Sequence, residues 1–202
     1  ALQRPIEFGA DLVVHSTTKY LNGHSDVVGG AVIAADASLG EELAWWANCL
    51  GTTGAPFDSF LTLRGVRTLH ARMGVHCLNA RAVVDAVEVH PAVRKVFYPG
   101  LPSHPGHHIA REQQDGFGAM LSLEIEGGAT GVRTFVESLR FFTLAESLGG
   151  VESLIAHPAT MTHASMDEAA RKAAGIDDCL VRLSVGIEDE IDLVDDICAA
   201  LD

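Results

Sequence analysis

The chain of 202 residues is poor in aromatic side chains, which make up 6% of it, and poor in positive charge. It has 14 basic and 27 acidic side chains, a formal net charge of −13, and no cluster of Lys or Arg. This charge repels phosphate backbones, which excludes nucleic acid as a partner. No apolar run approaches the roughly 20 residues that cross a bilayer, which excludes a membrane protein. With 48% hydrophobic residues, the chain is expected to form one or two globular domains.

Cysteines are few and widely spaced. Cys49, Cys77, Cys179 and Cys198 form no C-x-x-C pair and have no His at zinc-finger spacing. We therefore expect reduced thiols in a cytoplasmic protein. Residues 1–5 contain no initiator Met and no signal-peptide pattern, so we expect the sequence to be cut from a longer chain.

The N-terminal third has the order strand, loop, strand, helix. Residues 12–15 and 27–35 are apolar runs without alternation, which is typical of strands buried on both faces in α/β proteins. Ser38 and Glu41 have the spacing of a capping box, and this predicts a helix through residues 41–48.

The rest of the sequence has a different pattern. Apolar spacing predicts a long helix over residues 68–89, and period-two alternation predicts an antiparallel strand over 119–125. Further elements are expected, namely a strand at 180–185 and helices at 131–139 and 190–200. We place a domain boundary inside the long helix, which divides the chain into residues 1–78 and a small α+β domain of residues 79–202.

Only three lysines are present, and Lys19 differs from the other two. Lys95 and Lys172 each follow an arginine and are expected on the surface. Lys19 ends a strand among hydroxyls, and an enclosed lysine can form an imine with an aldehyde. Ser16 and Thr18 precede it at alternate positions and form a candidate phosphate cradle. The alternative is a strand-end lysine that reaches solvent, with Ser and Thr satisfying turn amides.

Arg182 lies in an apolar strand, and its planar guanidinium suits the two oxygens of a carboxylate. The alternative is a structural ion pair with one of the acids. Glu146 and Ser147 precede the Gly149-Gly150 turn and are either site residues or ordinary turn residues.

Some histidines suggest sites but carry little weight. His104, His107 and His108 lie in a Pro-Gly loop without a Cys or acid at ligand spacing, so we predict no metal site. His24 and Asp26 are interpreted as structural.

Residues 9–26, GADLVVHSTTKYLNGHSD, closely resemble the cofactor-lysine signature of the Cys/Met-metabolism family of pyridoxal-phosphate (PLP) enzymes. The resemblance continues, in order, through residues 57–59, 64–69, 116–120, 145–154, 161–164 and 181–188. It implies an α/β fold, in which the end of an aspartate-aminotransferase-like PLP-binding domain is followed by a smaller α+β C-terminal domain.

The resemblance also implies roles for individual residues. Lys19 would bind PLP covalently and then move protons, and Ser16 and Thr18 would bind the cofactor phosphate. Arg182 would bind the substrate carboxylate, with Ser147 lining the substrate site. Glu146 is typical of family members that handle cystathionine by γ-chemistry.

Family members have chains about twice as long, and their N-terminal half supplies further site residues. The resemblance therefore implies that residues 1–202 alone are inactive and fold poorly. It also implies small amino-acid substrates and a homotetramer built from dimers.

Within the family, residues 43–48, 51–54 and 169–176 favour γ-replacement, which joins O-succinylhomoserine and cysteine into cystathionine. The first alternative is γ-elimination, which cleaves cystathionine to cysteine, 2-oxobutanoate and ammonia. The second is a non-catalytic subunit that keeps the fold for assembly.

Overall fold

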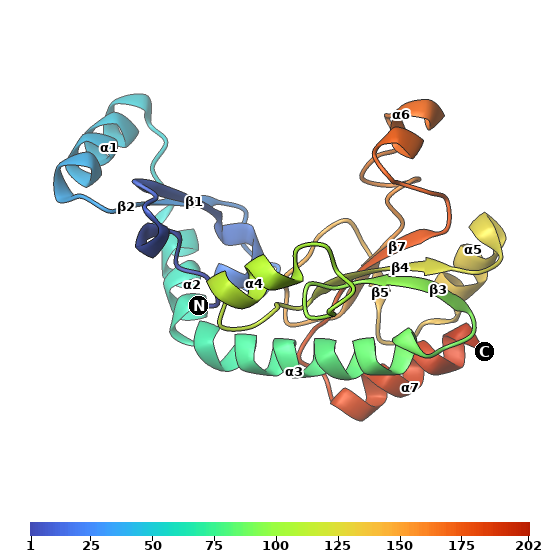
Figure 1. The fold of residues 1–202 in the computed structure, drawn as a ribbon. Helices are drawn as coiled ribbons and strands as arrows, with labels where there is room; N and C mark the ends of the chain where they lie inside the picture. Colours follow the sequence, from blue (N-terminus) through green and yellow to red (C-terminus); the bar gives the residue numbers. More distant parts are fainter.

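The computed structural model describes residues 1–202, except for the side chain of Glu168. Two parts of the chain are connected by the long helix α3 (Leu69–Glu88), which runs beneath both of them (Figure 1). Among the helices so described, none is long and apolar enough to cross a membrane.

The first part is a two-stranded ribbon with helices beside it. Its elements are η1 (Pro5–Phe8), β1 (Leu12–Ser16), η2 (Thr17–Leu21), β2 (Gly30–Ala34), α1 (Ala37–Leu50) and α2 (Pro56–Arg67). β1 and β2 are antiparallel, with Leu12 opposite Ala34 and Ser16 opposite Gly30. The predicted order of strand, loop, strand and helix is confirmed.

Two expectations for this part are wrong. Val14 is 75% exposed and Val32 50% exposed, so within residues 1–202 the ribbon is not buried on both faces, since η1, η2 and α1 cover only part of it. The helix starts before Ser38, because Asp36 is its N-cap. The Asp36 carboxylate accepts hydrogen bonds from the backbone N–H groups of Ser38 (2.8 Å) and Leu39 (3.3 Å). A hydrogen bond from the Ser38 hydroxyl, followed by these two backbone bonds, lowers the pKa of Asp36.

The second part is a five-stranded sheet with helices. The strands are β3 (Val93–Phe97), β4 (Met120–Ile125), β5 (Thr143–Leu144), β6 (Leu154–Ala156) and β7 (Leu180–Ser184), and the helices are α4 (His107–Gln113), α5 (Gly128–Ser138), α6 (Glu168–Ala173) and α7 (Glu190–Leu201). The strand order is β3-β4-β7-β6-β5, and every pair is antiparallel except the parallel β5–β6 pair. The antiparallel strand and both helices predicted for this region are confirmed.

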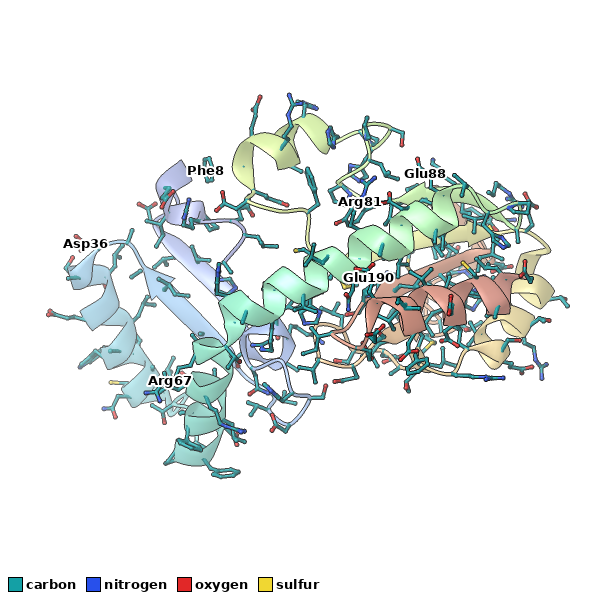
Figure 2. All side chains as sticks on the ribbon, turned by 90° about the horizontal axis from the view of Figure 1, so that it is seen from below. Phe8, Asp36, Arg67, Arg81, Glu88 and Glu190 are labelled. Carbon is teal, nitrogen blue, oxygen red and sulfur yellow. The ribbon has the colours of Figure 1, made fainter. Side chains whose placement is uncertain are left out.

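The main core lies between this sheet and helices α3, α5 and α7. Alternate residues of β4, such as Leu121 and Leu123, are fully buried, and the residues between them are only partly buried. Figure 2 shows α3 and α7 side by side, with Glu88 at the end of α3 and Glu190 at the start of α7. One face of the sheet is therefore apolar, as the period of two predicts.

Helix α3 is continuous through residue 78, where we placed the domain boundary. From Ala80 onward the helix buries valines in the core of the second part, whereas the turns up to Asn79 bury the polar residues Arg72, His76 and Asn79. The division into residues 1–78 and 79–202 therefore stays a proposal. The boundary lies near the middle of α3, where the buried side chains change from largely polar to apolar.

Candidate active site

Lys19 lies in η2, a single π-helical turn that follows directly after β1. The backbone of Lys19 leaves helical geometry (φ −91°, ψ −138°), and its carbonyl accepts a hydrogen bond of 2.8 Å from the N–H of Gly23. The side chain is half-buried, and its Nζ is 3.4 Å from the Ser147 hydroxyl oxygen. Among the described side chains, no carboxylate lies within ion-pair distance of Lys19. Its amine is directed to a hydroxyl instead of being neutralised by an acid.

Ser147 comes from the other part of the molecule, in the loop between β5 and β6. The same loop is held by Arg182 on β7, whose Nη2 donates to the backbone carbonyls of Glu146 (3.3 Å) and Ser147 (3.4 Å). The structure thus brings Lys19, Ser147 and Arg182 together, although 163 positions separate Lys19 from Arg182 in the numbering. The Glu146 side chain is exposed, and its backbone is what contacts Arg182.

Arg182 is half-buried and makes no ion pair with any carboxylate that the structure describes. The structural ion pair considered as its alternative role is therefore not found among those residues. Both of its hydrogen bonds go to neutral carbonyls, and at 3.3 and 3.4 Å they are longer than is usual for N–H···O bonds. The positive charge of Arg182 is available to a negatively charged ligand.

The two hydroxyls predicted to bind a phosphate lie in different surroundings. Thr18 Oγ1 accepts a hydrogen bond of 3.0 Å from the N–H of Gly29 and lies 3.4 Å from the Gly29 carbonyl oxygen. Ser16 ends β1 with its side chain exposed and without a capping bond to η2. The Thr18 hydroxyl closes the turn between η2 and β2, and the Ser16 hydroxyl faces outward.

Loop contacts connect the Lys19 turn to the Ser147 loop. The N–H of Val151 donates to the Gly23 carbonyl (3.0 Å), and the Ser25 hydroxyl donates to the Glu152 carboxylate. Ser25 has a φ of +57°, which is uncommon for a residue other than glycine. These bonds hold the two loops that carry Lys19 and Ser147 against each other.

The histidines outside the site have local partners. His24 Nδ1 bonds the Asn22 carbonyl at 2.7 Å, and Asp26 accepts a hydrogen bond of 2.6 Å from the Asn22 amide. His107 Nδ1 bonds the Pro99 carbonyl at 2.8 Å. In the part of the chain that the structure describes, no group of three His, Cys, Asp or Glu side chains could hold a metal ion.

Sequence reasoning missed the buried polar groups of three residues next to the Lys19 turn. Arg72 and His76 are 6% and 0% exposed, and the buried hydroxyl of Tyr20 has no hydrogen-bond partner among the described residues. Burial raises the pKa of Tyr20 to about 12. Their helical spacing could have indicated the burial of residues 72 and 76. Both positions lie on the same face of α3 as the buried Val83 and Val87.

Comparison with known proteins places the fold in the class of PLP-dependent enzymes. The chain belongs to the family of Cys/Met metabolism PLP-dependent enzymes, whose model matches residues 1–202. The family, the fold class and the cofactor predicted from the sequence are thereby confirmed.

Similar proteins include both synthases and lyases. Cystathionine gamma-synthase from Xanthomonas oryzae pv. oryzae, solved in complex with aminoacrylate and cysteine, is 65% identical with a TM-score of 0.95, over 100% of this chain and 52% of that one. Cystathionine gamma-synthase from Escherichia coli is 58% identical over 98% of this chain and 51% of its own length. Cystathionine beta-lyase from Coxiella burnetii is 53% identical, and cystathionine gamma-lyase from Dictyostelium discoideum 50% identical, each over 99% of this chain and 52% of its own length. The chain thus spans about half the length of the curated relatives it matches.

The residues around Lys19 fit PLP. The half-buried amine contacts a hydroxyl and not an acid, so it is able to react with the aldehyde of the cofactor. The exposed Ser16 hydroxyl and the Gly29-bonded Thr18 hydroxyl both lie within three residues before it in the sequence, as donors for a phosphate.

Proposed function

We propose that this protein catalyses γ-replacement, the formation of cystathionine from O-succinylhomoserine and cysteine, as a cystathionine γ-synthase of methionine biosynthesis. The observation that carries the proposal is the 3.4 Å contact between Lys19 Nζ and Ser147 Oγ, in a loop whose backbone Arg182 holds. High identity to two cystathionine gamma-synthases supports it.

Bound PLP supplies an aldehyde for covalent attachment and a pyridine ring that accepts electrons from the substrate. Lys19 is the attachment residue, and its amine, once released, carries protons from one substrate carbon to the next. The Ser147 hydroxyl keeps the amine near one position. This assignment needs an amine without a carboxylate partner, which the structure provides.

Arg182 binds the α-carboxylate of the substrate amino acid. Its guanidinium is half-buried without an acid partner, and a charge-assisted hydrogen bond to a carboxylate is stronger than its present bonds to carbonyls. Ser16 and Thr18 bind the cofactor phosphate. The exposed Glu146 carboxylate lies at the same loop and is available to an amino group of the substrate.

Cystathionine γ-lyase activity is the second candidate, and the 50% identity to a gamma-lyase supports it. A cystathionine beta-lyase is 53% identical, so identity alone does not separate these reactions. Substrate assays on the protein made from its complete coding sequence test the choice. Rapid turnover of O-succinylhomoserine with cysteine is expected, and efficient cystathionine cleavage with negligible succinylhomoserine turnover would refute the synthase.

The cofactor assignment has its own test. The same protein is incubated with PLP, reduced with borohydride and mapped by mass spectrometry of its peptides. We expect an adduct on Lys19 that is lost in Lys19→Arg and kept in Lys95→Arg, because Lys95 is an exposed residue of β3. No adduct on Lys19 would leave the non-catalytic assembly subunit as the better description.

We also propose that the protein assembles as a homotetramer, a dimer of dimers. Exposed apolar side chains on α1 and α2, including Trp45 (58%) and Phe57 (69%), support burial against other chain segments or subunits. Light scattering coupled to size-exclusion chromatography tests this, and a monomeric mass would refute it.

A further inference from the structure

The guanidinium of Arg72 is buried without any described carboxylate within ion-pair distance. Its Nη2 donates to the carbonyls of Tyr20 (2.9 Å) and Gly65 (2.9 Å), and its Nε donates to the Thr68 hydroxyl (3.2 Å). Burial also lowers the pKa of Arg72. A buried charge that faces only neutral acceptors is costly, so the fold keeps Arg72 at some expense in stability.

The carbonyls that Arg72 binds belong to the turn that carries Lys19. Tyr20 directly follows Lys19, and the same Nη2 lies 3.4 Å from the carbonyl of Leu21. The Lys19 carbonyl is bound by the N–H of Gly23. Three successive carbonyls, from Lys19 to Leu21, are thus hydrogen-bonded in a turn whose backbone departs from helical geometry at Lys19.

Two glycines make room for this arrangement. Gly23 has a φ of +73°, and a Cβ there would overlap Arg72 Nη1. A Cβ on Gly65 would overlap the backbone of Asn22, so α2 approaches the end of the turn closely only because residue 65 has no side chain. The guanidinium fits between α2 and the turn and binds both, which requires two or more donors on a planar group.

We propose that Arg72 is a positioning residue for Lys19. Its guanidinium fixes the turn of residues 19–23 against α2 and so keeps Lys19 Nζ within reach of Ser147 and of the cofactor aldehyde. This inference rests on the proposed role of Lys19 as the attachment residue. Arg72→Lys would keep the positive charge but lose the planar guanidinium, whose several donors bind α2 and the Lys19 turn at the same time.

The test uses the protein made from its complete coding sequence, with Arg72→Met, Arg72→Lys and the control Arg133→Met. Arg133 is exposed and pairs with Glu137 on the same helix. Hydrogen exchange is measured in peptides covering residues 17–23 without added PLP, and borohydride trapping of PLP on Lys19 is measured over a range of PLP concentrations. Arg72→Met removes charge-assisted hydrogen bonds to the turn, so the rate of hydrogen exchange in residues 17–23 is expected to rise about tenfold or more. The PLP concentration at which half of Lys19 is trapped is expected to rise by a similar factor.

Arg72→Lys should lie between the unchanged protein and Arg72→Met, and Arg133→Met should match the unchanged protein. A merely structural role would lower the melting temperature without a selective change at residues 17–23. A folded Arg72→Met protein with unchanged exchange there and unchanged trapping overturns the inference.

Thr68→Val covers the case in which Arg72→Met does not fold. It removes the acceptor of the Arg72 Nε bond and the 3.1 Å hydrogen bond that the Thr68 hydroxyl donates to the Gly65 carbonyl. Thr134→Val, at an exposed position of α5, is its control. Faster exchange at residues 17–23 in Thr68→Val but not in Thr134→Val supports the inference, and equal exchange in both overturns it. If the unchanged protein forms no adduct on Lys19, the proposed function fails. If it does and the variants behave as their controls, only the role of Arg72 fails.

Discussion

Gly149 packs against the backbone nitrogen of Tyr20, the residue after Lys19. A Cβ on Gly149 would lie 2.9 Å from that nitrogen and 3.0 Å from the Tyr20 ring, and Gly149 itself has a φ of +77°. We expect Gly149→Ala to push the Ser147 loop away from Lys19. Catalytic efficiency should fall about tenfold or more, because small displacements of reacting groups are costly. Steady-state kinetics on the complete protein measure the effect.

Gly175→Ala is the matched control for this change. Gly175 has a similar φ of +74°, but nothing lies within 4 Å of the added Cβ. Both variants bear the strain of an alanine in left-handed geometry, about 1–2 kcal/mol, and only Gly149→Ala meets the Lys19 turn. Equal catalytic efficiency in the two variants would contradict the importance of this contact.

Replacing Arg182 tests the substrate carboxylate site. Arg182→Met removes a charge-assisted bond worth about 1.5–3 kcal/mol, so kcat/KM should fall about 10- to 150-fold. Arg182→Lys should recover part of the loss, since the charge remains without the planar fork. Arg94→Met is the control, because Arg94 on β3 is exposed and pairs with the exposed Glu126. An unchanged kcat/KM in Arg182→Met would leave Arg182 with only its bonds to the loop backbone.

The start of α1 gives a stability prediction. Asp36→Ala should destabilise the protein by about 0.5–2 kcal/mol, because Asp36 caps the helix by accepting two backbone N–H groups. Ser38→Ala should cost less than about 0.5 kcal/mol, because Ser38 lies inside the helix and only adds a hydroxyl bond to Asp36. Thermal unfolding of both variants compares the observed cap with the one predicted from the sequence, and a larger loss in Ser38→Ala would favour the latter.

Local patterns of the sequence predict much of the fold. The alternation through β4 and the spacing through α3 are properties of one element each, and both structures form as predicted. The start of α1 was misplaced because Asp36 and Ser38 are both good caps, and only the backbone geometry selects between them. Exposure of β1 and β2 depends on which other segments cover them, which apolar content does not reveal.

The candidate site, like the fold, could be predicted from the sequence only in part. Lys19 stands out from its surroundings in the sequence, and its motif identifies the family, which the comparisons confirm. Arg72 is not evident, because an arginine in an amphipathic helix is ordinarily placed at the surface. Its burial depends on the close approach of α2 at Gly65, which lies in another element and makes room only in the folded chain.

His76 makes stability depend on pH. Burial lowers the pKa of this histidine, with a smaller contribution from the charge of Arg72, against the opposing effects of its bond to the Val185 carbonyl and of Glu188 and Glu152. Because a carbonyl only accepts, the Nδ1 of His76, 2.7 Å from Val185 O, carries the proton of the neutral ring.

The unfolded chain protonates this histidine near its ordinary pKa of about 6.5, whereas the folded chain resists protonation. The unfolded state therefore binds more protons as the pH falls below about 6.5, and the stability of the folded state falls with it. His76→Gln keeps a donor for Val185 O and removes the titration, so the melting temperature should depend less on pH between about 6.5 and 5. The exposed His108→Gln should keep the dependence of the unchanged protein. If both variants lose melting temperature equally on acidification, the proton that destabilises the fold binds elsewhere than at His76.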